Sequence, residues 1–195
     1  GGACYSQDAL DEIAAVAKEN GCGTHIDGAR IFNASIATGV DVARMCRDYD
    51  SVSICLSKGL GAPVGSVLVG SREFINKAHR WRKMFGGGWR QAGVLAAAAL
   101  HALDHHVERL AEDHTRARKV AEAIDSMDNF SVDLEAVQSN LVYVNCKIPA
   151  SDVVSSLAEH GVDMFDLPYN RVRVAIHLHI TDEDVDRIIA AFAAQ

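Results

Sequence analysis

The chain has 195 residues, of which 49% are hydrophobic and 23% are charged, and its formal net charge is −7. This composition is typical of a folded globular protein of one or two domains and excludes an extended disordered chain. The negative charge argues against nucleic acids and anionic membranes as partners. The longest apolar stretch, near residues 94–103, is shorter than the roughly 20 residues that a membrane-spanning helix needs.

The five cysteines lie far apart in the sequence and form no C-x-x-C pair. This pattern argues against a disulfide framework and against a thiolate zinc site, and it favours a reducing, cytoplasmic setting. The first residues contain neither an initiator methionine nor a signal-peptide pattern. We therefore expect the sequence to be part of a longer chain.

The first part of the chain predicts helices alternating with short strands. Ser6 is a helix N-cap and Asn20-Gly21 is a helix stop, which together predict a helix between them. Strands are expected at residues 24–27, 52–56 and 66–69, with a helix at 40–47. This alternation predicts an α/β layer with a mainly parallel sheet, in which the short return after Pro63 could make one strand antiparallel.

Further helices are expected at residues 71–83, 90–103 and 105–124, the second of them as a buried helix of small residues. Beyond residue 129, strands are expected at 141–145 and 171–178, and helices after Ser151 and after a capping box at Thr181. We therefore predict a partial large domain over residues 1–110 and a small C-terminal α+β domain over 111–195. The long helix near residues 105–125 would connect them.

The most informative single residue is a lysine at the end of a strand. Lys58 follows the apolar, β-branched run SVSICLS and precedes the turn GLGAP. A lysine amine at the end of a buried strand can form a Schiff base with a carbonyl group. Upstream, Asp27 and Arg30 lie three residues apart at the end of another short strand. Pyridoxal phosphate needs an anion beside its ring nitrogen and a lysine for its aldehyde, so these residues indicate a site for that cofactor.

Three motifs in series resemble the threonine aldolase family: HIDGAR at residues 25–30, LSKGLGAP at 56–63 and RKMFGGGWRQAG at 82–93. The resemblance covers most of residues 1–125 and continues more loosely to the C-terminus. It implies an α/β fold of the aspartate-aminotransferase type, which is fold type I of the pyridoxal-phosphate-dependent enzymes, and it implies that cofactor.

The resemblance also implies roles for the matching residues. Lys58 would hold pyridoxal phosphate covalently, and Asp27 would pair with the protonated ring nitrogen. Arg30 would lie near the cofactor and the substrate carboxylate. Arg173 would bind the substrate carboxylate in the small domain, for which a guanidinium fork is well suited.

The activity that the resemblance implies is cleavage of a β-hydroxy-α-amino acid between Cα and Cβ. L-Threonine or L-allo-threonine would give glycine and acetaldehyde. The assembly implied is a homotetramer in which Lys83 and Arg90 reach into a neighbouring subunit's site. The resemblance implies no metal.

Other interpretations remain open from the sequence. The same scaffold supports β-elimination or racemisation, and the chain could be a non-catalytic fragment because the residues before Asp27 supply no phosphate cup. Asp27 could simply cap the turn that follows it. Arg171 and Arg173 share a strand face, where either could be a solvated charge. His177 and His179 also share a face, as a metal pair would, without a third ligand spaced nearby.

Overall fold

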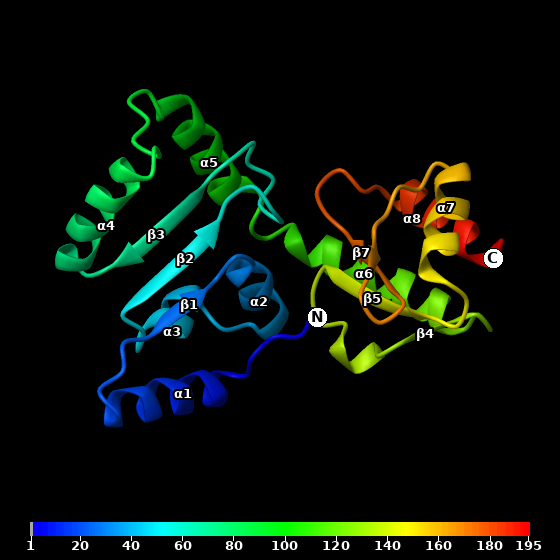
Figure 1. The fold of residues 1–195 in the computed structure, drawn as a ribbon, viewed down its shortest axis with the longest axis horizontal. Helices are drawn as coiled ribbons and strands as arrows, with labels where there is room; N and C mark the ends of the chain where they lie inside the picture. The colour runs from blue at the N-terminus through cyan, green and yellow to red at the C-terminus, as the bar shows by residue number, and fades with distance from the viewer. Residues whose placement is uncertain (1) are drawn as a thin grey trace. The chain divides into compact units, whose positions relative to one another are not determined.

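The computed structural model describes residues 2–195, which form two compact units (Figure 1). The first unit comprises Tyr5–Glu108, and the second comprises Arg109–Gln195 together with residues 2–4. None of the helices in residues 2–195 combines the length and the apolar character needed to cross a membrane.

A three-stranded mixed sheet in the order β1-β2-β3 forms the centre of the first unit (Figure 1). β1 (His25–Asp27) pairs in parallel with β2 (Ser51–Cys55), which pairs antiparallel with β3 (Ser66–Gly70). The sheet is thus mixed, and the strand after the short return at Pro63 is the antiparallel one, as the sequence allowed. The reason is the short connection after β2, which returns the chain directly along its neighbour.

The helices of the first unit begin close to the residues that cap them. The Ser6 hydroxyl accepts a hydrogen bond from Ala9 N–H at 3.2 Å, and Ser71 caps a later helix by accepting from Phe74 N–H at 3.2 Å. The helices are α1 (Gln7–Glu19), α2 (Ile31–Thr38), α3 (Val42–Cys46), α4 (Arg72–Met84) and α5 (Gly93–His105). The short α2 was not expected from the sequence.

The small-residue helix α5 is largely solvent-exposed, so the prediction of a buried helix is wrong. Val94 and Leu100 are 81% and 60% exposed, whereas Ala99 and Ala102 are buried. An alanine-rich sequence favours a helix but marks no single apolar face. Burial is therefore set by the neighbouring elements.

One face of the first sheet is apolar. Val52 of β2 is buried with Ile31 of α2 and Met45 of α3, and Ile26 and Ile54 pack against this cluster. Because side chains alternate along a strand, the residues between them point to the opposite face.

Gly28 allows the chain to pass closely over β2 immediately after Asp27. Its N–H donates to the Ser53 carbonyl at 2.8 Å, and a Cβ built on Gly28 would lie 2.9 Å from that same oxygen. We expect Gly28→Ala to destabilise the first unit by about 1–3 kcal/mol, because a rigid backbone atom must move. Chemical denaturation measures this. Gly23→Ala is the control, since the nearest atom to its Cβ would be 3.8 Å away, and an equal loss of stability there would contradict the steric explanation.

An ion pair joins α1 to α3. Both terminal nitrogens of Arg44 donate to the Asp11 carboxylate. These hydrogen bonds, with a further one from Gln7, lower the pKa of Asp11 from 3.8 to about 2. A carboxylate whose pKa is lower in the folded than in the unfolded protein stabilises the fold. This stabilisation is fully present at pH values above the unfolded-state pKa, and it is lost as the pH falls to the pKa of the folded state.

We therefore expect the urea midpoint of the first unit to fall between about pH 4 and pH 2, and to fall less in Asp11→Asn. Denaturation curves over this range measure the effect. Asp8→Asn changes a neighbouring acid on the same helix and should retain the decrease of the wild type. If the urea midpoint decreased equally with pH in the wild type and in Asp11→Asn, the assignment of this decrease to Asp11 would be contradicted.

The second unit contains an antiparallel sheet in the order β4-β5-β7-β6. Its core is formed by fully buried side chains from the sheet and from three helices, such as Val144, Val172, Val120 and Phe192. The elements are α6 (Leu110–Asp125), β4 (Phe130–Val132), a 3₁₀ turn (Leu134–Ala136), β5 (Leu141–Cys146), α7 (Ala150–Glu159), β6 (Asp166–Leu167), β7 (Arg171–Ala175) and α8 (Asp182–Ala193).

Several boundaries in this part of the chain differ from those expected. α6 begins at Leu110 instead of residue 105, and β7 ends at Ala175 instead of 178. α7 begins after Pro149, one residue before the expected Ser151. The short strands β4 and β6 were not expected, because pairing with longer neighbours defines them. The capping box at Thr181 is confirmed, with the Thr181 and Asp184 side chains bonding reciprocally to backbone N–H groups.

Candidate active site

Polar side chains gather on the face of the first sheet that lies opposite its apolar core. The strand register places His25 beside Ser51 and Asp27 beside Ser53. The His25 ring nitrogens lie 2.9 Å from Ser51 Oγ and 3.3 Å from Ser53 Oγ. His25 was not identified from the sequence. The alternation of His25 with Asp27 and of Ser51 with Ser53 is the signal that could have indicated it.

Asp27 is the last residue of β1, and its side chain is exposed. Its Oδ1 accepts a hydrogen bond from Ala29 N–H at 3.2 Å. Asp27 therefore does cap the following turn, which was one of the interpretations left open. Because the side chain is exposed, its carboxylate is open to a ligand. Arg30 follows three residues later and lies, half-buried, at the N-cap of α2.

Lys58 lies in a compact loop that begins where β2 ends. Leu56 N–H donates to the Gly65 carbonyl at 3.0 Å, and Ala62 N–H donates back to the Leu56 carbonyl at 3.0 Å. Gly61 N–H closes a turn onto the Lys58 carbonyl at 2.9 Å, with Gly61 at a φ of 72°. Leu56, Leu60 and Ala62 are buried, so the loop is anchored at several points.

The Lys58 side chain is exposed, although the sequence placed it at the end of a buried strand. Among the described residues its amine has neither a hydrogen-bond acceptor nor an ion-pair partner. Because β1 and β2 are parallel neighbours, Asp27 at the end of β1 and Lys58 shortly after the end of β2 lie at the carboxyl ends of adjacent strands. Ligands of open α/β sheets bind outside these ends. An available carboxylate oxygen and an available amine at this edge fit the ring nitrogen and the aldehyde of pyridoxal phosphate.

Arg173 lies in the second unit, on β7 opposite Tyr143 of β5. It is exposed, and its neighbours Val172 and Val174 are buried. Arg173 lines a cavity of about 470 Å³, together with Phe165, His177 and other residues of this unit. No side chain in the described part of the chain forms an ion pair with its guanidinium.

The two arginines on β7 are not equivalent. The Arg171 guanidinium lies 5.7 Å from the ring centroid of Tyr143 and 5.4 Å from that of Tyr169, and its Nε donates to the Pro168 carbonyl. These contacts favour a structural role for Arg171. Arg173 is therefore the arginine that remains available for a carboxylate.

Lys83 and Arg90 flank the triple glycine. Lys83 lies in the last turn of α4 and Arg90 in the connection to α5, and both are exposed. Gly88 lies so close to Lys83 that a Cβ on this glycine would be 2.5 Å from the lysine Cδ. In residues 2–195 no hydrogen bond or ion pair joins Lys83 or Arg90 to Asp27 or Lys58.

The fold is that of the pyridoxal-phosphate-dependent enzymes of fold type I. Solved structures superpose on nearly the whole chain. A threonine aldolase of Leishmania major matches with a TM-score of 0.80 at 18% identity, covering 97% of this chain and 56% of that one. A serine palmitoyltransferase of Sphingomonas wittichii matches with a TM-score of 0.71 at 20% identity, covering 98% of this chain and 51% of that one.

Residues 1–147 match the beta-eliminating lyase family, and the chain belongs to that family. Low-specificity L-threonine aldolase 1 of Arabidopsis thaliana is 43% identical over 98% of this chain, and the low specificity L-threonine aldolase of Escherichia coli K12 is 38% identical over 99%. The chain spans 55% and 57% of the lengths of these relatives. The resemblance found in the three motifs is thus confirmed, as is the expected cofactor, since this is a family of pyridoxal-phosphate-dependent enzymes.

Proposed function

We propose that this protein is a pyridoxal-phosphate-dependent aldehyde-lyase that cleaves L-threonine or L-allo-threonine to glycine and acetaldehyde. The observation that carries the proposal is the placement of Asp27 and Lys58 at the carboxyl ends of adjacent parallel strands, with the lysine amine exposed. The names of the relatives support the choice of threonine as substrate.

Each residue has a defined task in this proposal. Pyridoxal phosphate, when bound, supplies an electron sink for negative charge at the substrate Cα. Lys58 holds the cofactor covalently from its anchored loop. The Asp27 carboxylate keeps a proton on the ring nitrogen, and Arg30 lies beside Asp27 on the same connection.

Arg173 binds the substrate carboxylate through two parallel N–H donors. This fixes the orientation of the amino acid, so that the bond between Cα and Cβ is the one that breaks. The proton of the β-hydroxyl must leave as acetaldehyde forms, and a proton must return to Cα to give glycine.

The setting and the assembly are part of the same proposal. All five cysteines are free thiols, which favours the cytoplasm. Exposed Lys83 and Arg90 on either side of the triple glycine suit a homotetramer in which they complete a neighbouring subunit's site. The reaction would contribute to threonine breakdown and to glycine formation.

The test is to incubate the intact protein with pyridoxal phosphate and L-threonine or L-allo-threonine and to identify the products. We expect glycine and acetaldehyde in equal amounts. 2-Oxobutyrate and ammonia would instead show β-elimination, and conversion to D-amino acid would show racemisation. Cofactor capture without turnover of either substrate would contradict the proposed activity.

A further inference from the structure

A histidine outside the motifs contacts the loop that carries Lys58. The His106 Nδ1 atom lies 2.7 Å from the carbonyl oxygen of Leu60, two residues beyond Lys58. A carbonyl oxygen can only accept, so His106 donates this hydrogen bond and carries its proton on Nδ1. Both residues belong to the first unit.

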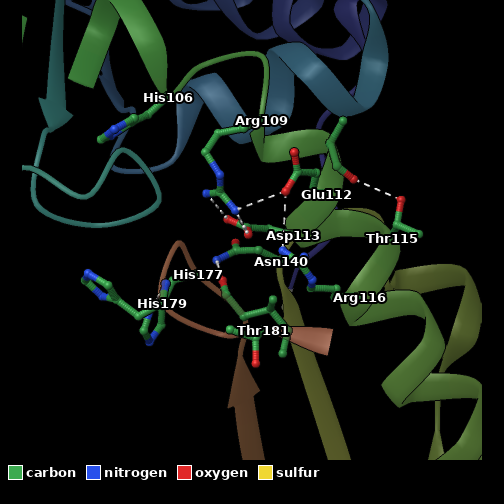
Figure 2. A network of polar contacts seen from close by, with 12 residues as sticks. His106, Arg109, Glu112, Asp113, Thr115, Arg116, Asn140, His177, His179 and Thr181 are labelled. Atoms are coloured by element: carbon green, nitrogen blue, oxygen red, sulfur yellow. Dashed lines mark hydrogen bonds and ion pairs between the residues drawn. The ribbon is translucent and has the colours of Figure 1, made fainter. Parts of the chain in front are cut away.

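The position of His106 is itself well fixed. It is the C-cap residue of α5, and its N–H donates to the Ala102 carbonyl at 2.9 Å. Ala99 and Ala102 of α5 are buried, so this helix is held on one side. The His101 ring centroid lies 5.3 Å from that of His106, at an interplanar angle of 89°. The half-buried imidazole of His106 extends from the end of α5 (Figure 2).

The backbone hydrogen bonds donated by Leu56, Gly61 and Ala62 run to carbonyl groups of the same loop, which extends from residue 56 to residue 65. They fix the shape of the loop, but they do not tie its tip to another element. The His106 bond does so, because it connects the tip to the end of a helix formed more than 30 residues later. The Leu60 side chain is also buried, so its carbonyl and its side chain are both held.

We propose that His106 is a positioning residue for Lys58, which holds the loop so that the lysine amine meets the cofactor aldehyde at the strand end. This inference rests on the proposed function for the role of Lys58.

The test compares His106→Leu with His106→Asn in the intact protein. Leucine removes the donor, whereas the Asn side-chain NH₂ lies the same number of bonds from Cβ as Nδ1 and restores it. Hydrogen exchange by mass spectrometry reports on the loop without any cofactor. We expect the amides of residues 56–65 to exchange roughly 5-fold to 30-fold faster in His106→Leu, as expected for a loss of one to two kcal/mol. We expect His106→Asn to remain close to the wild type.

The second readout is the rate at which added pyridoxal phosphate becomes fixed to Lys58 under borohydride. It should be slower in His106→Leu and restored in His106→Asn. His105→Leu is the matched control: this exposed neighbour ends α5, and its ring contacts His101 at a centroid distance of 4.5 Å. It should leave both the loop exchange and the capture rate unchanged.

Wild-type loop exchange in His106→Leu would overturn the proposal, as would loop loosening of equal size in His105→Leu. If His106→Leu does not fold, nitrogen NMR of the wild type decides. A His106 Nδ1–H protected from solvent exchange supports the tie, and rapid exchange overturns it. Failure of the proposed function is distinct, because Lys58 would then remain unlabelled in the wild type while the loop exchange still responds to His106.

Discussion

Lys58→Ala is expected to abolish the covalent capture of pyridoxal phosphate and to reduce kcat for threonine cleavage by at least about 10³-fold, as with the loss of other covalent nucleophiles. The physical reason is that Lys58 is the one lysine among the described residues that directly follow β1 and β2, at 28–30 and 56–65. Borohydride reduction of the intact protein with cofactor, followed by peptide mass spectrometry, locates the label. The label should be on Lys58 in the wild type and lost in the variant.

Two control variants show whether the effect comes from the loss of the Lys58 amine, from the loss of its positive charge, or from the loss of any exposed lysine. Lys58→Arg keeps the positive charge but has no amine that forms a Schiff base, so it should be as inactive as Lys58→Ala. Lys77→Ala removes an exposed lysine of α4, whose amine lies 2.7 Å from Glu73, and should leave capture and turnover intact. Labelling of another lysine with full activity in Lys58→Ala would refute the assignment of the cofactor site.

Asp113→Ala is expected to have the largest effect on stability, with a loss of about 3 kcal/mol from the second unit. Asp113 is fully buried at the start of α6, and both of its oxygens accept hydrogen bonds from Arg109, at 2.7 and 3.3 Å (Figure 2). The Arg109 side chain is 15% exposed. Removing the carboxylate takes away the close, buried partner of a mostly buried guanidinium and leaves it only the exposed Glu112 carboxylate at 3.8 Å, which costs more than the pair itself contributes.

Glu112→Ala is a closely matched control for this substitution. Glu112 also lies in the first turn of α6 and also pairs with Arg109, at 3.8 Å, but its side chain is 59% exposed. Both acids interact with the same helix N-terminus, so the difference between the variants isolates the effect of burial. We expect Glu112→Ala to lose less than about 1 kcal/mol.

The measurement must report on the second unit alone. Both tryptophans, Trp81 and Trp89, belong to the first unit, so their fluorescence reports directly on that unit and not on α6. Hydrogen exchange of amides in α6 and β5 in increasing urea gives the local free energy of unfolding. Similar losses in the two variants would contradict the role assigned to burial.

The sequence was sufficient for elements whose signals are local. Ser6, Ser71 and the capping box at Thr181 mark the starts of α1, α4 and α8 within a few residues. The strands β2 and β3 also lie where their β-branched residues place them, and β1 lies within one residue of the expected strand. In contrast, α2 gave no helical signal, and α6 began later than its helix-favouring sequence suggests. Short strands such as β6 exist only through their partners.

For the candidate site, too, the sequence supplied some residues and the structure supplied further information. Asp27, Arg30, Lys58 and Arg173 were identified from motifs, and their roles remain predictions to be tested. The structure adds the reason to favour Arg173 over Arg171, since Tyr143 and Tyr169 engage the latter.

The sequence by itself determined the family, the cofactor and the order of most elements, because capping, strand runs and motifs involve residues within a few positions of one another. Only the tertiary structure decided the antiparallel return of β3, the exposure of α5, the contact of His25 with two serines and the burial of Asp113. It also revealed the hydrogen bond from His106 to the lysine loop. These features depend on which distant segments meet, and on how much water the contact removes, and neither is encoded in a local pattern.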